Sequence, residues 1–189
     1  MDNNVFSTHD DEPLWEQTRH LYYELHMFLA TGFLLSNLEP VRIRSEIWIK
    51  NALEESFVIH FRVLHDFFYG RTKRKYDITA QDFMKQMVDW KKVRVKQVPL
   101  LAKAKKRANF EIAHLTKNRV DTPSPEKIWP TQEIITEMLV LIEKFINNAS
   151  PHKLHPKFIE LVKSWKDPEF IKFHANEPHT SIFERISND

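Results

Sequence analysis

The chain has 189 residues, a length that suits one compact domain with a substantial core. It contains no cysteine, which excludes disulfide scaffolds, thiolate zinc sites and cysteine nucleophiles. No run approaches the roughly 20 apolar residues that span a bilayer, and the acidic N-terminus lacks the pattern of a signal peptide. We therefore expect a soluble, cytoplasmic protein with no membrane partner.

The net charge of +2 conceals a strongly basic segment. Residues 71–107 hold 13 Lys and Arg and 3 Asp, a net +10, whereas the rest of the chain holds 15 against 23 Asp and Glu, a net −8. A basic segment in an otherwise acidic protein is typical of surfaces that receive phosphates. Solvated helix faces are often rich in lysine as well, so charge alone does not separate the two interpretations.

Two long helices are predicted in the first part of the chain. Residues 1–12 form a flexible acidic arm in this interpretation, and Pro13 suits the first turn of a helix. Apolar residues then repeat at helical spacing as far as residues 32–37. A glutamate–proline pair interrupts the pattern, and a second helix is predicted over about residues 41–69. This second helix is apolar on several sides, which indicates a central position.

Four polar residues recur along one side of the second helix: Asn51, Glu55, Arg62 and Asp66. In a buried helix such groups need partners, because an unpaired charge in a core costs several kcal/mol. One interpretation is an internal ion pair of Arg62 with Asp66 or Glu55. The other is that the row faces a functional site and holds its residues in place. The pattern is compatible with both.

Shorter elements follow the two long helices. Thr79 and Asp82 have the pattern of an N-cap with an acidic third residue, which predicts a helix over about residues 80–90. Pro99 suits the start of another helix, which we expect to continue to about residue 119, before a proline-rich crossing.

Two further amphipathic patterns complete the predicted domain. They cover residues 131–147 and about 156–165, and the last residues, 167–189, are predicted to form an irregular tail. No alternating strand pattern and no internal repeat is present. The sequence therefore predicts an all-α domain over residues 13–166, an antiparallel bundle of about four long helices plus short ones.

Arg107 and His114 lie seven residues apart inside the helix predicted from Pro99. Seven steps of about 100° fall roughly 20° short of two turns, so the two side chains would share a face, with Glu111 between them. An imidazole can move a proton at neutral pH, and a guanidinium can stabilise charge on a phosphate. The trio could bind and cleave a phosphodiester, or it could be a solvated charge row.

Other catalytic and metal-binding patterns are missing from the sequence. It has no Gly-rich phosphate loop, no Gly-x-Ser-x-Gly and no His-Glu-x-x-His. The histidines do not pair: His60 and His65, five residues apart, would point about 140° away from each other on a helix. We expect neither a metal nor a cofactor.

An Arg followed by six residues and a His, late in a small all-α bundle, resembles the HEPN superfamily (higher eukaryotes and prokaryotes nucleotide-binding domains). The stretches NALEESFVIHFRVLHDFFYG and AHLTKNRV also resemble a group of uncharacterised bacterial HEPN-like proteins, and the likeness covers roughly residues 14–146. The family often has a polar residue directly after the Arg. Here that place is Ala108, with Asn109 one further on, which leaves open a domain that kept the fold and lost the chemistry.

The resemblance implies a metal-independent endoribonuclease that acts as a homodimer, with Arg107 and His114 as the catalytic pair and 2′,3′-cyclic phosphate ends as products. It also implies a role in toxin–antitoxin pairs or phage defence, with an antitoxin or regulatory protein as a further partner. Glu111, Asn109 and the polar row of the second helix would support the pair. The residues expected to bind RNA are Arg71, Lys73, Arg74, Lys75, Lys91, Lys92, Arg94, Lys103 and Lys106.

Two functions of other classes stay open. One is a non-catalytic helical module that binds a partner protein or a nucleic acid through the same surface. The other is a DNA-binding domain, which we rank last because the sequence has no helix-turn-helix pattern with a glycine-containing tight turn.

Overall fold

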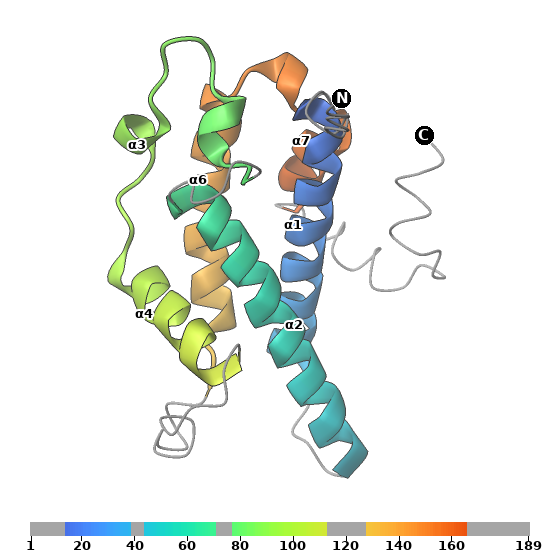
Figure 1. Ribbon diagram of the computed structural model, residues 1–189. Helices are drawn as coiled ribbons and strands as arrows, with labels where there is room; N and C mark the ends of the chain where they lie inside the picture. Colours follow the sequence, from blue (N-terminus) through green and yellow to red (C-terminus); the bar gives the residue numbers. More distant parts are fainter. Residues whose placement is uncertain (1–13, 39–43, 71–76, 113–127, 166–189) are drawn as a thin grey trace, which may run out of the picture.

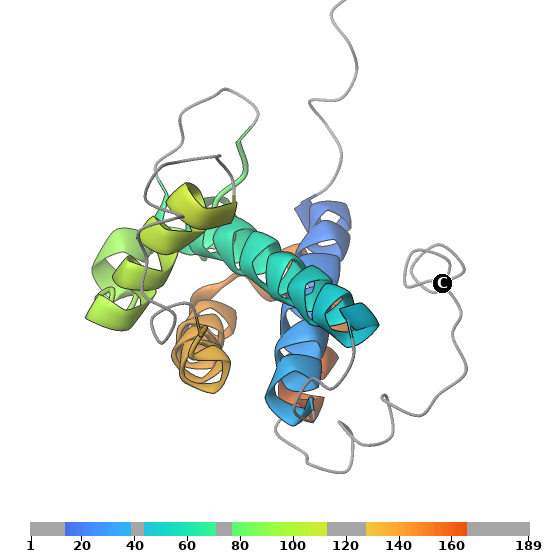
Figure 2. The same ribbon diagram turned by 90° about the horizontal axis from the view of Figure 1, so that it is seen from below.

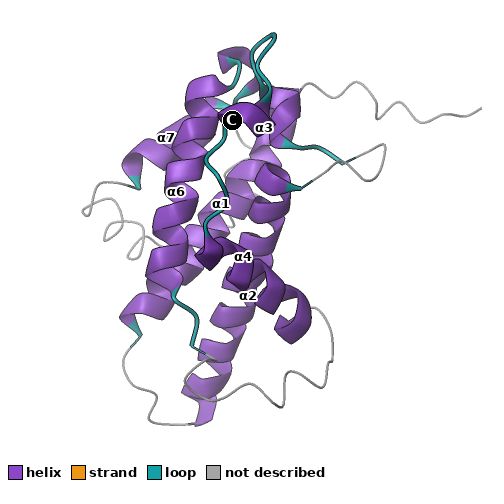
Figure 3. Ribbon diagram, turned by 90° about the vertical axis from the view of Figure 1, so that its left-hand side faces the viewer, coloured by secondary structure: helices purple, strands orange, loops and turns teal. Residues whose placement is uncertain are grey.

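A computed structural model describes residues 14–38, 44–70, 77–112 and 128–165 of the chain, and it confirms the all-α class (Figure 1). No strand occurs in the described parts, which consist of helices and connecting loops (Figure 3). The five longer helices are α1 Leu14–Asn37, α2 Arg44–Tyr69, α4 Pro99–Arg107, α6 Thr131–Asn148 and α7 Pro156–Ser164. The short elements are the 3-10 turns η2 Ala80–Phe83 and η5 Pro151–Lys153, helix α3 Trp90–Val93 and the π-helical turn η3 Ala108–Ile112.

Helices α1, α2, α6 and α7 agree with the predicted helices to within a few residues, because each carries a long apolar repeat that the tertiary structure buries. Viewed along the bundle, α2 lies between α1 and α4, on the side away from α6 and α7 (Figure 2). The predicted acidic arm, residues 1–12, and the predicted tail, residues 167–189, lie outside the described residues.

The packing of α1 against α2 forms one half of the core. Phe28 of α1 stacks on Phe57 of α2 with ring centroids 4.9 Å apart, and both side chains are fully buried. Gly32 lets α6 approach the same place: a Cβ atom there would lie 2.5 Å from Cδ1 of Ile135 and 2.9 Å from the ring of Phe57. A side chain at this position would therefore push the three helices apart.

Phe145 of α6 is the centre of a second, aromatic part of the core. Its ring lies 5.4 Å from that of Phe68 at the end of α2, 5.9 Å from that of Phe83 in η2 and 5.9 Å from that of Trp90 in α3. A further contact at 6.3 Å joins it to Phe158 of α7. Five elements thus share one aromatic cluster, which packs η2 and α3 of the basic segment against the long helices.

The prediction of one helix over residues 80–90 is wrong: the 3-10 turn η2 ends at Phe83, and α3 begins only at Trp90. The predicted cap forms, because the Asp82 carboxylate accepts a hydrogen bond from the backbone N–H of Thr79 at 2.7 Å. The chain leaves the helical path after η2, and the carbonyl of Phe83 accepts from the backbone N–H of Ser150 at 2.8 Å. Since an α-helix needs that carbonyl for residue 87, pairing with a distant segment ends the helix after one turn.

The helix that begins at Pro99 also differs from the prediction. It is α-helical only to Arg107, and the next five residues form the π-helical turn η3. A π turn is wider than an α turn, so the angle calculated between Arg107 and His114 from 3.6 residues per turn does not apply. Leu101, Ala104 and Ala108 of this segment are buried in the core, and Leu100 is partly buried against it.

Candidate functional site around Arg107

Arg107 is fixed at the end of α4 by the segment that leads into α6. The carbon of its guanidinium group lies 4.2 Å from the centroid of the Trp129 ring, and its Nη1 donates a hydrogen bond to the carbonyl of Ile128 at 3.3 Å. Trp129 is buried, with 6 % of its surface exposed. The indole is therefore a rigid platform that sets the position of the positive charge.

A pocket of about 720 Å³ opens beside this pair, between the end of α1, helix α4 and the start of α6. Lys103 and Arg107, one turn apart on α4, bring two positive charges to its wall, and Glu133 brings one negative charge. Ser36 and Thr131, whose hydroxyl oxygens are 3.0 Å apart, join α1 to α6 at the rim. The pocket therefore combines an apolar wall with two cationic groups and one anionic group.

Glu54 of α2 is the carboxylate whose pKa Arg107 influences. Burial raises the pKa of Glu54, while the charges of Lys50 and of Arg107 oppose that shift. Lys50 Nζ lies 3.7 Å from Oε1 of Glu54. Glu55, the neighbouring carboxylate that was predicted to support the pair as part of the polar row, lies on the solvent-facing side of the helix.

The predicted polar row on α2 lies on the outside of the bundle. Asn51, Glu55 and Asp66 are exposed and Arg62 is partly exposed, whereas the opposite side of the helix is buried against α1. The expectation that the row is buried is therefore wrong. The proposed pairing of Arg62 with Asp66 or Glu55 does not occur among the described residues, because Asp66 pairs with Lys105 of α4.

The Asp66 carboxylate links α2 to α4. Its Oδ2 accepts from Lys105 Nζ at 2.5 Å, and its Oδ1 lies 3.7 Å from Nδ1 of His65. Burial raises the pKa of Asp66, but the adjacent His65 ring and Lys105 ammonium outweigh burial and lower it to about 2. His65 in turn contacts Gln97 through its Nε2, at 2.8 Å. These contacts orient α4 and so position Arg107 indirectly.

The remaining supporting residues are described only in part. Asn109 lies in η3, partly buried, and Glu111 is in the same turn by its backbone. His114, and with it the second half of the predicted catalytic pair, lies outside the described residues, as do the predicted RNA-binding residues Arg71, Lys73, Arg74 and Lys75.

The predicted RNA-binding residues that the structure describes fall into two groups. Lys91, Lys92, Lys103 and Lys106 are exposed on α3 and α4. Arg94 is different: its Nη1 donates to the carbonyl of Phe68 at 2.7 Å, and its guanidinium carbon lies 4.8 Å from the Tyr69 ring centroid. Arg94 therefore fastens α3 to the end of α2.

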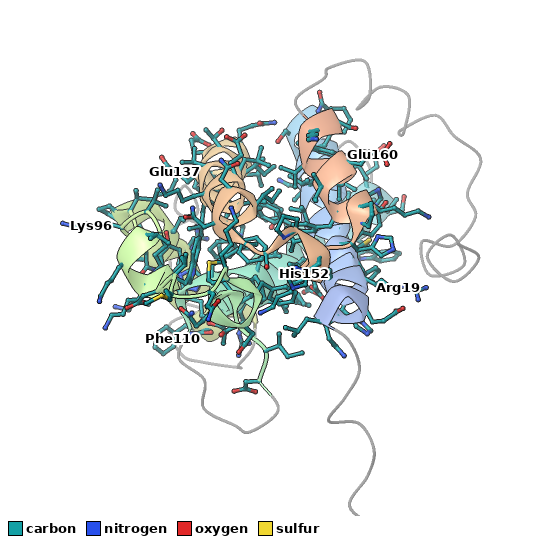
Figure 4. All side chains as sticks on the ribbon, turned by 90° about the horizontal axis from the view of Figure 1, so that it is seen from above. Arg19, Lys96, Phe110, Glu137, His152 and Glu160 are labelled. Carbon is teal, nitrogen blue, oxygen red and sulfur yellow. The ribbon has the colours of Figure 1, made fainter. Side chains whose placement is uncertain are left out.

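The side of the molecule formed by α3 and α4 carries this positive charge. Figure 4 shows Lys96 and Phe110 on this side, across the molecule from Arg19 on α1 and Glu160 on α7. The basic side chains could be predicted from the sequence, whereas the positions of Trp129 and Glu54 beside Arg107 were not predicted. The only signal for Trp129 was a tryptophan next to Pro130, directly before a predicted helix.

The described residues contain neither a metal cluster nor a membrane span. No group of three or more His, Asp or Glu side chains there is arranged to hold a metal ion. None of the helices in the described ranges is long and apolar enough to cross a membrane.

Comparisons of the chain with protein-family models, with curated proteins and with solved structures gave no match. The likeness to HEPN domains therefore rests on the sequence patterns alone, and the case for a function rests on the residues around Arg107.

Proposed function

We propose that the protein is a metal-independent endoribonuclease of the HEPN type, acting as a dimer, with Arg107 and His114 as its catalytic pair. The observation that best supports this function is the position of Arg107. Its guanidinium is held on the buried Trp129 ring at the wall of a pocket to which Lys103 adds a second positive charge. A cation that is fixed before substrate binds is what stabilisation of a phosphate transition state requires.

The chemistry follows from these two side chains. The 2′-hydroxyl of the ribose attacks the adjacent phosphorus, and the bond to the 5′-oxygen of the next nucleotide breaks. His114 moves a proton at the attacking or the leaving oxygen, and Arg107 stabilises the charge that develops on the phosphate. The products are a 2′,3′-cyclic phosphate and a 5′-hydroxyl end. The role of His114 comes from its place in the Arg-x6-His pattern.

The exposed lysines of α3 and α4 would bring the RNA backbone to this pocket. Lys103 lines the pocket itself, and Lys106 precedes Arg107 directly. Contacts of this kind neutralise phosphates without reading bases, so they supply affinity that depends on salt rather than on sequence.

The test is cleavage of total RNA and of transfer RNA by the purified protein in EDTA. Wild type should produce fragments with cyclic phosphate ends. Arg107→Ala and His114→Ala should each lower the rate by about 100-fold or more, the usual cost of losing a transition-state contact or a general acid–base group. Arg19→Ala, which removes a partly exposed arginine on α1 that pairs with Glu16, is the matched control and should cleave like wild type.

Two outcomes would overturn the proposal: no cleavage by wild type, or undiminished cleavage by the His114 variant. Salt-sensitive RNA binding without cleavage would favour the non-catalytic binding module. That module predicts that His114→Ala leaves binding unchanged, whereas charge removal at Lys103 and Arg107 weakens it.

A further inference from the structure

The outward side of α2 carries a row of exposed apolar side chains. Trp48, Ile59 and Val63 are 65 %, 50 % and 43 % exposed, and Ala52 is exposed between them. Spacings of four, seven and four residues keep these side chains on one side of the helix. We call this set, together with Glu55 and Arg62, the α2 stripe.

No described element packs on the α2 stripe. Helix α1 packs on the opposite side of α2, η3 lies against one flank, and α6 and α7 lie on the far side of the bundle (Figure 2). Single exposed apolar side chains are ordinary on a protein surface, but a stripe that follows one helix side over four turns is typical of a helix–helix interface. Its heptad-like spacing suits another helix as the occupant.

The charges within the α2 stripe show which helix fits. Among the described residues, neither Glu55 nor Arg62 has an ion-pair partner. They are seven residues apart, about 10 Å along the axis, which is twice the separation at which two side chains of one helix usually pair. A helix that brings a cation to Glu55 and an anion to Arg62 would satisfy both.

We propose that the α2 stripe binds the α2 stripe of a second copy of this chain, with the two helices antiparallel about a twofold axis near Ile59. Glu55 lies four residues before Ile59 and Arg62 three residues after it. In an antiparallel pair, residues at matching distances on either side of the axis come opposite each other. Glu55 of each copy therefore meets Arg62 of the other, and Ile59 of one copy packs against Ile59 of the other between these two ion pairs.

A twofold interface must be self-complementary, and the opposite charges of Glu55 and Arg62 meet that condition. This proposal names the interface of the dimer that is part of the proposed function, and it rests on the proposed function only for the expectation that the protein is a dimer. Mass measurements test the α2 interface and RNA cleavage tests the chemistry, so cleavage by a protein that does not dimerise through α2 would refute the interface and leave the roles of Arg107 and His114 standing.

The test uses sedimentation velocity on the full chain over a range of concentrations. Wild type should be dimeric. Glu55→Arg and Arg62→Glu should each place two like-charged pairs in the interface and weaken the dimer by about tenfold or more. The double variant Glu55→Arg/Arg62→Glu should restore it. Ile59→Asp should give monomers, whereas Val140→Asp, at an equally exposed position on α6, should not.

Mixing the two single variants, Glu55→Arg and Arg62→Glu, gives the sharpest result. In their heterodimer, the arginine introduced into one copy faces the glutamate introduced into the other, and the native Arg62 of the first copy faces the native Glu55 of the second. The mixture should therefore dimerise although each variant alone is weakened. A role of these residues within one copy cannot produce that recovery.

Circular dichroism should show unchanged helix content in all of these variants, so that a change in mass reports on the interface and not on folding. A monomeric wild type, or dimerisation that ignores both charge reversals, overturns the proposal.

Discussion

The guanidinium of Arg107 stacks on the ring of Trp129, 4.2 Å from its centroid, and so joins the end of α4 to the start of α6 across 21 intervening residues. Cation–π contacts of this kind contribute about 0.5–1 kcal/mol at exposed sites, and more when desolvated. Here the contact also holds the Arg107 side chain against the segment that precedes α6.

Two substitutions of Trp129 should distinguish its role in positioning Arg107 from its contribution to the stability of the fold. Trp129→Phe keeps an aromatic face beneath Arg107, so we expect a small loss of stability and RNA cleavage close to wild type. Trp129→Ala removes a buried ring and should lower the free energy of unfolding by about 3–5 kcal/mol. When it is measured well below the melting temperature of Trp129→Ala, the RNA cleavage rate of this variant should be reduced, as it is in Arg107→Ala. Full activity of Trp129→Ala would contradict a positioning role.

Asp66 should make stability depend on pH in the acid range. Its pKa is about 2 in the folded protein, below the unfolded value of about 3.9, so the unfolded chain binds more protons as the pH falls. The stabilisation is complete above about pH 5 and is lost towards pH 2. Because the side chain is 55 % exposed, the effect should not exceed about 1 kcal/mol.

Urea unfolding of wild type and Asp66→Asn at several pH values measures this contribution. The two proteins should differ at pH 6 and converge near pH 2. In addition, Lys105→Met should raise the pKa of Asp66, which carboxyl NMR can follow directly. An unchanged pKa in that variant would exclude Lys105 as a cause of the shift.

Gly32 should not tolerate even a methyl group. Alanine favours a helix over glycine by about 1 kcal/mol, but its Cβ would lie 2.5 Å from Cδ1 of Ile135. We expect Gly32→Ala to lower the free energy of unfolding by about 1–2 kcal/mol net, because overpacking outweighs propensity. Ile135→Val removes the clashing atom, so the double variant should be more stable than the two single losses predict. Simple additivity would contradict the clash.

Replacing Met87 by glycine should stabilise the protein. It has a φ of 65°, which side chains with a Cβ adopt at a cost, and it is 99 % exposed. Met87→Gly should raise the free energy of unfolding by about 0.5–1 kcal/mol, since the left-handed region is open to glycine. Met87→Ala keeps the Cβ and should change little. An equal gain in the alanine variant would mean that the backbone conformation is not the cause.

The longer helices were predictable because their evidence is local. A stripe such as Leu21, Leu25 and Phe28 requires a helix to gather it on one side, whatever the helix then meets. The segment after Phe83 was not predictable in the same way. Its carbonyl bonds to Ser150, and no local pattern reveals a hydrogen-bond partner 67 residues away.

The helical class, the basic segment and Arg107 as a candidate could all be predicted from the order of residues alone. The side of α2 that is buried could not, because an apolar helix gives no sign of which apolar residues, such as Trp48 and Ile59, its neighbours leave uncovered. The tertiary structure decided this, and it also decided that Lys105 is joined to Asp66 and that Arg107 lies on Trp129. The spacing of apolar residues along the chain indicates where helices form, whereas contacts between distant residues depend on how those helices pack.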